Sequence, residues 1–241
     1  MSLTSHKLIS VIIPVYNHAH ILKQSIGSLL AQTYRPLEII IVNDGSTDNF
    51  NDIAVDIKID MDKNKIPYKI INQKNLGATV ARNLGFKESR GDYIIFWDAD
   101  TIAKKKMLEI MCLKLEANPQ TNFVYSGFKF GWKKFKCLAF NEERLKKFNY
   151  IDITSLLKRE DFCGFDESLK KFQDWDLWLT LIEKNKQGIG IPQILYKKIV
   201  GSRTGISFWL PKIFYKLPFK ISEVDKYKKA TDIILKKHQI K

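Results

Sequence analysis

The stretch Tyr93-Ile-Ile-Phe-Trp-Asp-Ala-Asp100 decides the fold class, because an apolar run ends there in two carboxylates. Residues 93–97 are β-branched or aromatic and are typical of a buried strand. Asp98 and Asp100 follow directly, and two carboxylates one residue apart can share a hard divalent cation. An isolated Asp-x-Asp is more often a solvated turn with a helix-capping aspartate. The neighbouring segments therefore have to decide between these interpretations.

Three similar apolar runs precede this one, at residues 8–14, 37–42 and 68–71, and helical patterns lie between the runs, at residues 21–30, 48–62 and 78–89. Apolar strands that alternate with helices predict an α/β fold with a mostly parallel central sheet and helices on both faces. Ligands bind such sheets at the carboxyl ends of the strands. Those ends are polar here, so we expect a site where they meet Asp98.

The second half of the chain is less regular. We predict helices over residues 104–118 and 174–186, strands over 123–125 and 190–196, and a final amphipathic helix from Ser222. Residues 126–160 are predicted to be irregular, basic and aromatic. Within them lies a basic aromatic cluster, made of Lys129, Lys133, Lys134 and Lys136 among Phe128, Phe130, Trp132 and Phe135.

Two polar positions near the first strands have a chemical and a structural interpretation. Asp44 ends the second strand, where it can accept a hydrogen bond from a ligand or belong to a turn with Gly45. Arg82, one turn into a helix, offers a guanidinium fork that suits phosphate or an ion pair with one of the carboxylates of the Asp-x-Asp. Both interpretations of Arg82 can hold together.

Asp174 lies at the start of a predicted helix, beside Trp175. A helix N-terminus stabilises the anion, whereas an apolar neighbour raises the pKa of a carboxyl group. Together these effects can tune a general base. The alternative is a simple N-cap.

Composition is that of an ordinary globular protein, since 45% of the 241 residues are hydrophobic and 27% are charged. The three cysteines form no Cys-x-x-Cys pair, which argues against a disulfide framework and favours a cytoplasmic location. No GxGxxG, GxxxxGK[ST], HExxH or GxSxG motif occurs, which disfavours dehydrogenases, P-loop NTPases, zincins and nucleophile-elbow hydrolases. No apolar run is long enough for a membrane span, and no signal-peptide core is found, so we expect neither a span nor export.

The formal charge of +14 is unevenly distributed, because residues 203–241 hold ten Lys and Arg against three acids. Excess positive charge suits nucleic acid, anionic lipid or a phosphorylated substrate. Charge alone does not choose among them.

Five segments in register resemble a known family: VIIPVYN (11–17), EIIIVNDGSTD (38–48), NLGATVARNLG (75–85), GDYIIFWDAD (91–100) and GFDESLKKFQDWDLWLTL (164–181). Over roughly residues 8–200 the chain resembles family 2 glycosyltransferases of the GT-A fold. The resemblance implies transfer of a sugar from a nucleoside diphosphate sugar to an acceptor hydroxyl, with inversion at the anomeric carbon. It also implies a catalytic domain over residues 1–203. Residues 204–241 lie outside the resemblance, and their composition predicts a basic aromatic helical extension.

The resemblance implies roles for single residues. The donor nucleotide would contact Pro14, Tyr16, Asn17, Asp44, Arg82 and Asp98. Asp100 would hold Mn²⁺ or Mg²⁺ against the diphosphate, and Asp174 would be the general base. Acceptor or phosphate contacts are expected from Gln173, Trp175 and Arg203. A base N–H acceptor at Asp44 suits uracil, thymine or guanine, and UDP-sugars are the commonest donors in the family.

Two departures from the family pattern leave an alternative open. Relatives usually have Glu-Asp where this chain has Gln173-Asp174, and many place a metal-binding His in a segment like residues 196–202, which holds none. Metal binding would then be weaker or would depend on Asp100, diphosphate and water, with Lys198 or Arg203 sharing the phosphate charge. The alternative function is a catalytically silent GT-A subunit that binds nucleotide sugar or a partner at the membrane.

The expected partners are a nucleoside diphosphate sugar and a saccharide or polyprenyl-linked acceptor, in surface glycan biosynthesis. The aromatic and basic residues of 204–241 fit an anchor on the anionic inner face of the cell membrane, but also a lid or a surface for a homo-oligomer. No helix-turn-helix, zinc module or RNP-type pattern occurs, so no nucleic-acid partner is expected.

Overall fold

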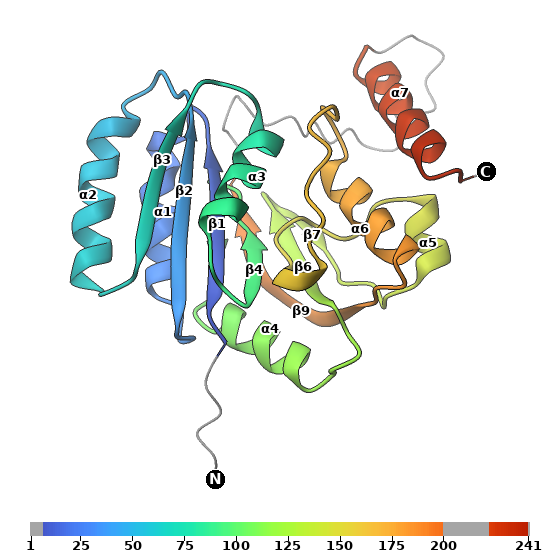
Figure 1. Cartoon of the computed structure of the whole chain (residues 1–241), viewed down its shortest axis with the longest axis horizontal. Helices are drawn as coiled ribbons and strands as arrows, with labels where there is room; N and C mark the ends of the chain where they lie inside the picture. Colours follow the sequence, from blue (N-terminus) through green and yellow to red (C-terminus); the bar gives the residue numbers. More distant parts are fainter. Residues whose placement is uncertain (1–6, 200–221, 241) are drawn as a thin grey trace.

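The computed structural model describes residues 7–199 and 222–240 (Figure 1). Among them are the strands β1 (Ile9–Val15), β2 (Leu37–Asp44), β3 (Tyr68–Gln73), β4 (Tyr93–Phe96), β5 (Thr101–Ala103), β6 (Phe123–Phe130), β7 (Lys133–Phe135), β8 (Leu156–Lys158) and β9 (Gly188–Lys198). The helices there are α1 (Ala19–Leu30), α2 (Phe50–Lys63), α3 (Ala78–Glu88), α4 (Met107–Glu116), α5 (Glu142–Lys147), α6 (Gln173–Glu183) and α7 (Ser222–Lys237).

The strands form one sheet in the order β3-β2-β1-β4-β8-β6-β9-β5, with β7 paired to β6. Strands β3, β2, β1 and β4 run parallel, which confirms the prediction from the first hundred residues. Beyond them, β8 is antiparallel to both β4 and β6, and β9 is parallel to β6 but antiparallel to β5. The second half of the sheet is therefore mixed.

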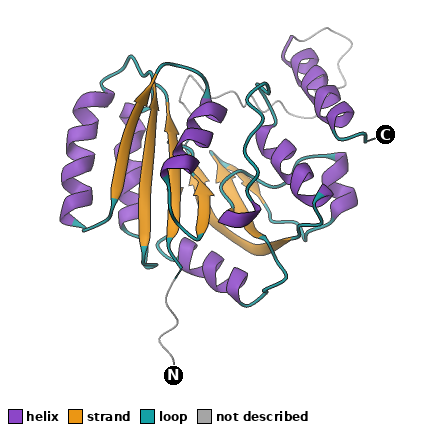
Figure 2. Cartoon of the chain, viewed as in Figure 1, coloured by secondary structure: helices purple, strands orange, loops and turns teal. Residues whose placement is uncertain are grey.

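Helices cover both faces of the sheet (Figure 2), as its alternating side chains require. Along β1, Val11 and Ile13 enter one core with residues of α1, α2 and α4, whereas Ile12 enters the other with residues of α3, α6 and α7. The β1 strand is therefore apolar almost throughout, as expected of a strand that is buried on both faces.

Residues 126–160 are not irregular, which corrects the prediction from the sequence. Strand β6 continues to Phe130, turns at Gly131 with φ of +56°, and pairs with β7, while α5 and β8 follow. In these strands aromatic and lysine residues alternate, with Phe128 opposite Phe135 and Lys129 opposite Lys134. The alternation is the apolar–polar pattern of a half-buried strand, in which lysines are the polar residues on the exposed side.

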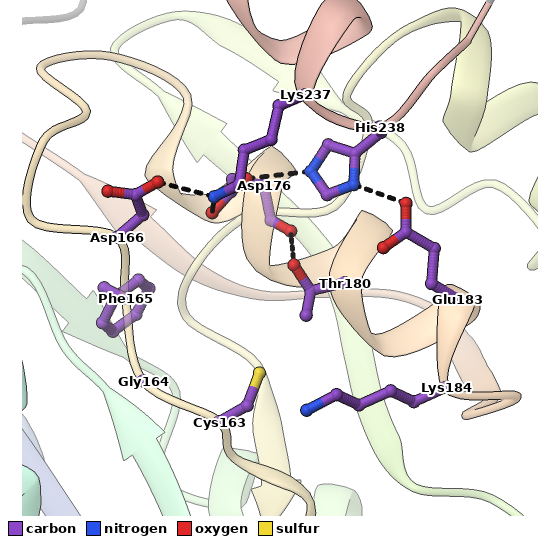
Figure 3. Close-up of a pocket in the computed structure, with 10 residues that line it drawn as sticks. All are labelled: Cys163, Gly164, Phe165, Asp166, Asp176, Thr180, Glu183, Lys184, Lys237 and His238. Carbon is purple, nitrogen blue, oxygen red and sulfur yellow. Dashed lines mark hydrogen bonds and ion pairs between the residues drawn. The ribbon is translucent and has the colours of Figure 1, made fainter.

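Helix α7 confirms the amphipathic helix predicted from Ser222, and it packs on α6. Ile234 is fully buried in the same apolar cluster as Trp178 of α6. Beside it, His238 contacts Asp176 at 2.8 Å and Glu183 at 2.7 Å (Figure 3). We call these contacts, with the ion pairs of Lys237 to Asp166 and Asp176, the α6–α7 clamp.

No helix within residues 7–199 and 222–240 is both long enough and apolar enough to cross a bilayer.

Candidate active site

Asn17 ties the carboxyl ends of β1 and β2 together. Its Oδ1 accepts hydrogen bonds from the backbone N of Thr47 at 2.7 Å and of Asp48 at 3.3 Å. Its φ of +55° lies in the left-handed region, which asparagine tolerates better than most residues. Pro14 and Tyr16 precede it and are half-buried, so the predicted nucleotide residues of β1 lie at the sheet edge where ligands bind.

Asp44 ends β2 and is almost fully buried, with 3% of its surface exposed. Its carboxylate accepts hydrogen bonds from Gln73 Nε2 at 2.7 Å and from the backbone N of Leu76 at 2.8 Å and of Gly77 at 2.9 Å. These bonds fix the loop that leads into α3. Asp44 thus has a structural role, and its contact with the base of a nucleotide stays a prediction.

Asp98 is held between two cations. Arg82 Nη2 donates to its Oδ1 at 2.8 Å, as the ion-pair interpretation of Arg82 predicts, and Lys198 Nζ donates to its Oδ2 at 2.7 Å. Burial alone would raise the pKa of Asp98, but the charges of Lys198 and Arg82 more than reverse this effect and hold it well below its usual range. Asp98 is therefore a fixed anion.

Lys198 also donates to Asp152 Oδ2 at 2.6 Å, and Tyr196 Oη donates to the other Asp152 oxygen at 2.8 Å. Burial tends to lower the pKa of Lys198, yet the two carboxylates hold it well above its ordinary value. The ammonium is consequently a permanent cation, and only 12% of its side chain is exposed. Lys198, at the end of β9, thus links Asp98 to Asp152 in the segment before β8.

Asp100 differs from Asp98 in having an oxygen without a partner. Its Oδ1 is buried and makes no hydrogen bond to any described residue. Burial, and then the charge of Asp98, raise the pKa of Asp100 to about 6. An orphaned carboxylate oxygen fits a hard cation, and Mg²⁺ or Mn²⁺ needs few protein ligands when phosphates and waters complete its shell. Among the described residues, no cluster of three or more His, Cys, Asp or Glu could hold the metal by itself.

Asp174 lies in the first turn of α6 and is not its N-cap, because Phe172 takes that position with φ of +60°. One Asp174 oxygen accepts from Asn149 Nδ2 at 2.8 Å and the other from the backbone N of Trp175 at 2.9 Å. Burial, and then the charge of Asp152, raise the pKa of Asp174 to about 6. Such a group is mostly ionised at neutral pH and still basic enough to accept a proton.

The remaining predicted contacts divide into three cases. Gln173 is half-buried, and its Nε2 donates to the carbonyl oxygen of Leu169 at 3.1 Å. Trp175 is only 2% exposed, and its indole N–H donates to the carbonyl oxygen of Leu145 at 2.7 Å. Its ring belongs to the core, and the acceptor or phosphate contact expected of Trp175 stays a prediction. Arg203 lies outside the described residues.

Asp152 and Asn149 are site residues that the sequence did not indicate. Both fall in the segment predicted to be irregular. The charge of Asp152 nevertheless helps to raise the pKa of Asp100 and of Asp174, and Asn149 donates a hydrogen bond to Asp174. One local signal exists, since Asp152 lies between the buried residues Ile151 and Ile153. A lone carboxylate in an apolar run needs a partner, but the sequence does not say which.

The site thus brings the Asp-x-Asp, the basic residues and the candidate base onto one electrostatic network. The Glycosyl transferase family 2 profile matches residues 10–171, which is most of the chain. The chain belongs to glycosyltransferase family 2. An uncharacterized glycosyltransferase of Haemophilus influenzae is 32% identical over 76% of this chain and 74% of its own length. An uncharacterized glycosyltransferase of Rickettsia bellii is 42% identical over 81% of this chain. This chain spans only 29% of the length of that relative, and 33% of the length of a relative from Rickettsia conorii.

Solved structures agree on the fold of this family 2 chain. Staphylococcus aureus TarS in complex with UDP-GlcNAc superposes with a TM-score of 0.69 at 19% identity, covering 96% of this chain and 71% of that chain. Mannosyltransferase PcManGT from Pyrobaculum calidifontis, in complex with GDP-Man and Mn²⁺, gives 0.66 at 18% identity and covers 83% of this chain and 59% of that chain. The predicted GT-A fold is therefore confirmed.

Proposed function

We propose that the chain is an inverting glycosyltransferase that uses a nucleoside diphosphate sugar, most simply a UDP-sugar, and a hydroxyl of a saccharide or lipid-linked acceptor. The observation that carries this proposal is Asp174, a carboxylate with a pKa raised to about 6 on the network that contains Asp98 and Asp100. The relatives that bind UDP-GlcNAc and GDP-Man with the same fold support a nucleotide-sugar donor.

In the proposed reaction Asp174 takes the proton of the acceptor hydroxyl. The acceptor oxygen then forms a bond to the anomeric carbon from the face opposite the diphosphate. The bond from that carbon to the diphosphate oxygen breaks, and the electron pair leaves with the nucleoside diphosphate. The configuration at the anomeric carbon is thereby inverted.

The fixed charges of the site suit the departing diphosphate. Asp100 is the residue that would hold Mn²⁺ or Mg²⁺, and the metal would supply positive charge to the leaving group. Lys198 adds a permanent cation nearby, and Arg82 keeps Asp98 ionised and oriented. Asn149 orients Asp174, because its amide donates to one of the two base oxygens.

The test is a transfer and hydrolysis assay with a panel of UDP-sugars and Mn²⁺, comparing Asp174→Asn with the wild type. General-base catalysis is worth about 10²–10⁴-fold, so turnover should fall by that factor while UDP affinity, measured by calorimetry, stays unchanged. Asp52→Asn, at an exposed carboxylate in the first turn of α2, is the matched control. Full activity of Asp174→Asn would refute the base assignment.

Nucleotide-sugar binding by the wild type without turnover of any donor would instead favour the silent subunit. Gln173 in place of the usual Glu and the absence of a His in residues 196–202 motivate this second candidate.

A further inference from the structure

The turn between β6 and β7 carries the most exposed large apolar side chain of the described residues. Trp132 is 88% exposed, whereas the next value, for Leu76, is 61%. It follows Gly131 at the tip of the hairpin formed by Phe123–Phe130 and Lys133–Phe135, which we call the β6–β7 hairpin. Single exposed apolar residues are ordinary, so Trp132 needs its surroundings to carry meaning.

Those surroundings are uniformly basic. Residues 126–141 contain four lysines and no acid. Lys129, Lys134 and Lys136 are exposed and have no carboxylate partner among residues 7–199 and 222–240. Moreover, Lys129 and Lys134 occupy directly opposite positions on the two strands. Like charges in that arrangement destabilise a hairpin, so an external anion would relieve a cost that the fold alone does not explain.

Two other aromatic rings of the hairpin, those of Phe128 and Phe135, are already packed within the protein. Phe128 stacks on Phe135 with centroids 4.7 Å apart, and also on Tyr196 at 5.4 Å. Few ring faces are therefore open for stacked nucleic-acid bases, which need several exposed aromatic platforms. Trp132 stands out as an exposed indole among cations.

We propose that the tip of the β6–β7 hairpin docks on an anionic lipid bilayer. The indole of Trp132 enters the interface, where tryptophan is favoured in membrane proteins. Lys129, Lys134 and Lys136 meet the lipid phosphates, and each lysine near an anionic surface adds attraction. Charge complementarity and the exposed indole select this partner over a nucleic acid or an acidic protein.

The β6–β7 hairpin lies next to the candidate site. Phe130 pairs with Lys198 in the β6–β9 ladder, and Gly131 N donates to the Lys198 carbonyl oxygen at 3.4 Å. Docking would hold the site close to the bilayer surface. A lipid-linked acceptor would then reach the site from the membrane, and this consequence alone rests on the proposed function.

Vesicle flotation of the full chain tests the proposal, with phosphatidylcholine vesicles that contain 30% phosphatidylglycerol or none. We expect binding to the anionic vesicles alone, and weakening with salt. Trp132→Ser should reduce binding. Lys129→Ser combined with Lys134→Ser should reduce it by about fivefold per lysine. Lys58→Ser combined with Lys105→Ser removes the same charge from exposed positions on α2 and before α4, and should change binding less.

Brominated lipids give a second readout, because they quench only tryptophans that enter the bilayer. Trp97, Trp175 and Trp178 are buried, and Trp209 lies outside the described residues. In a Trp209→Phe background, Trp132→Ser should therefore abolish most of the quenching. Unchanged flotation and quenching in both hairpin variants would overturn the proposal. Preferential binding of RNA or of an acidic protein over the vesicles, lost in the hairpin variants, would overturn it as well.

Discussion

The ammonium of Lys198 lies 2.7 Å from Oδ2 of Asp98, although 100 positions separate the two residues in the chain. The contact joins the end of β9 to the segment that follows β4, and the same ammonium reaches Asp152 at 2.6 Å. One lysine thus neutralises part of the charge of two carboxylates that line the candidate site. Removal of this ammonium should lower the stability of the protein and loosen the orientation of Asp98.

Lys198→Met should destabilise the protein by about 3 kcal/mol, because it leaves Asp98 and Asp152 partly buried with one counter-ion fewer. Urea unfolding measures the loss. Lys197→Met, at the exposed neighbouring position, is the control and should cost little. Adding Asp152→Asn to Lys198→Met should recover part of the loss, and a simple sum of the two single effects would contradict the coupling.

The fall of the turnover rate at acid pH, its acid limb, should report the protonation of Asp174. Its pKa is raised to about 6, so below that pH the base becomes protonated and kcat falls toward a tenfold loss per pH unit. A profile of kcat between pH 4.5 and 8 would locate the limb. Because the pKa of Asp100 is also raised to about 6, Asn149→Ala assigns the limb. It removes a hydrogen bond that favours the charged form of Asp174, so it should move the limb to higher pH. A limb near pH 4 in the wild type would contradict this assignment.

Asp44→Asn should loosen the loop that leads into α3. The amide keeps one acceptor oxygen, but its NH₂ group would face backbone N–H donors of Leu76 or Gly77, at a cost of about 2 kcal/mol. Hydrogen exchange should accelerate at those two amides. Asp56→Asn breaks only an exposed pair with Lys23 and should leave them protected. Equal exchange in Asp44→Asn and the wild type would argue against this role.

The α6–α7 clamp should make stability depend on pH. Burial lowers the pKa of His238, but its hydrogen bonds to Asp176 and Glu183 raise it above 6.5 on balance. A raised pKa means that the stabilisation is complete below pH 6.5 and is lost as the pH rises through the folded-state value.

His238→Ala should therefore lower stability by about 2 kcal/mol at pH 5.5 and by less at pH 9, where Lys237 still pairs with Asp176. Thermal unfolding at both pH values measures the difference, with His20→Ala at an exposed position of α1 as the control. The same loss at both pH values would show that His238 contributes packing rather than charge.

The sequence predicts the first half of the fold well, because strands such as β1 and β2 are buried on both faces and therefore read as apolar runs. It also places Asp98 and Asp100 at a strand end. It fails for Asp152 and Asn149, whose importance comes from contacts with residues 46 and 25 positions away. No local periodicity encodes such pairs. It likewise misses β7, although phenylalanine and lysine alternate in both strands as a half-buried hairpin requires.

Helix α7 is attached to α6 by two kinds of side chain. Ile234 is buried in the apolar core, and the clamp residues Lys237 and His238 contact Asp176. Such an attachment does not require the backbone to be continuous between β9 and α7. The chain accordingly offers a division into two fragments, 1–221 and 222–241, that could be reassembled from separate polypeptides. Because Asp176 is on the same helix as Asp174, recovery of activity on mixing would report the reassembly directly.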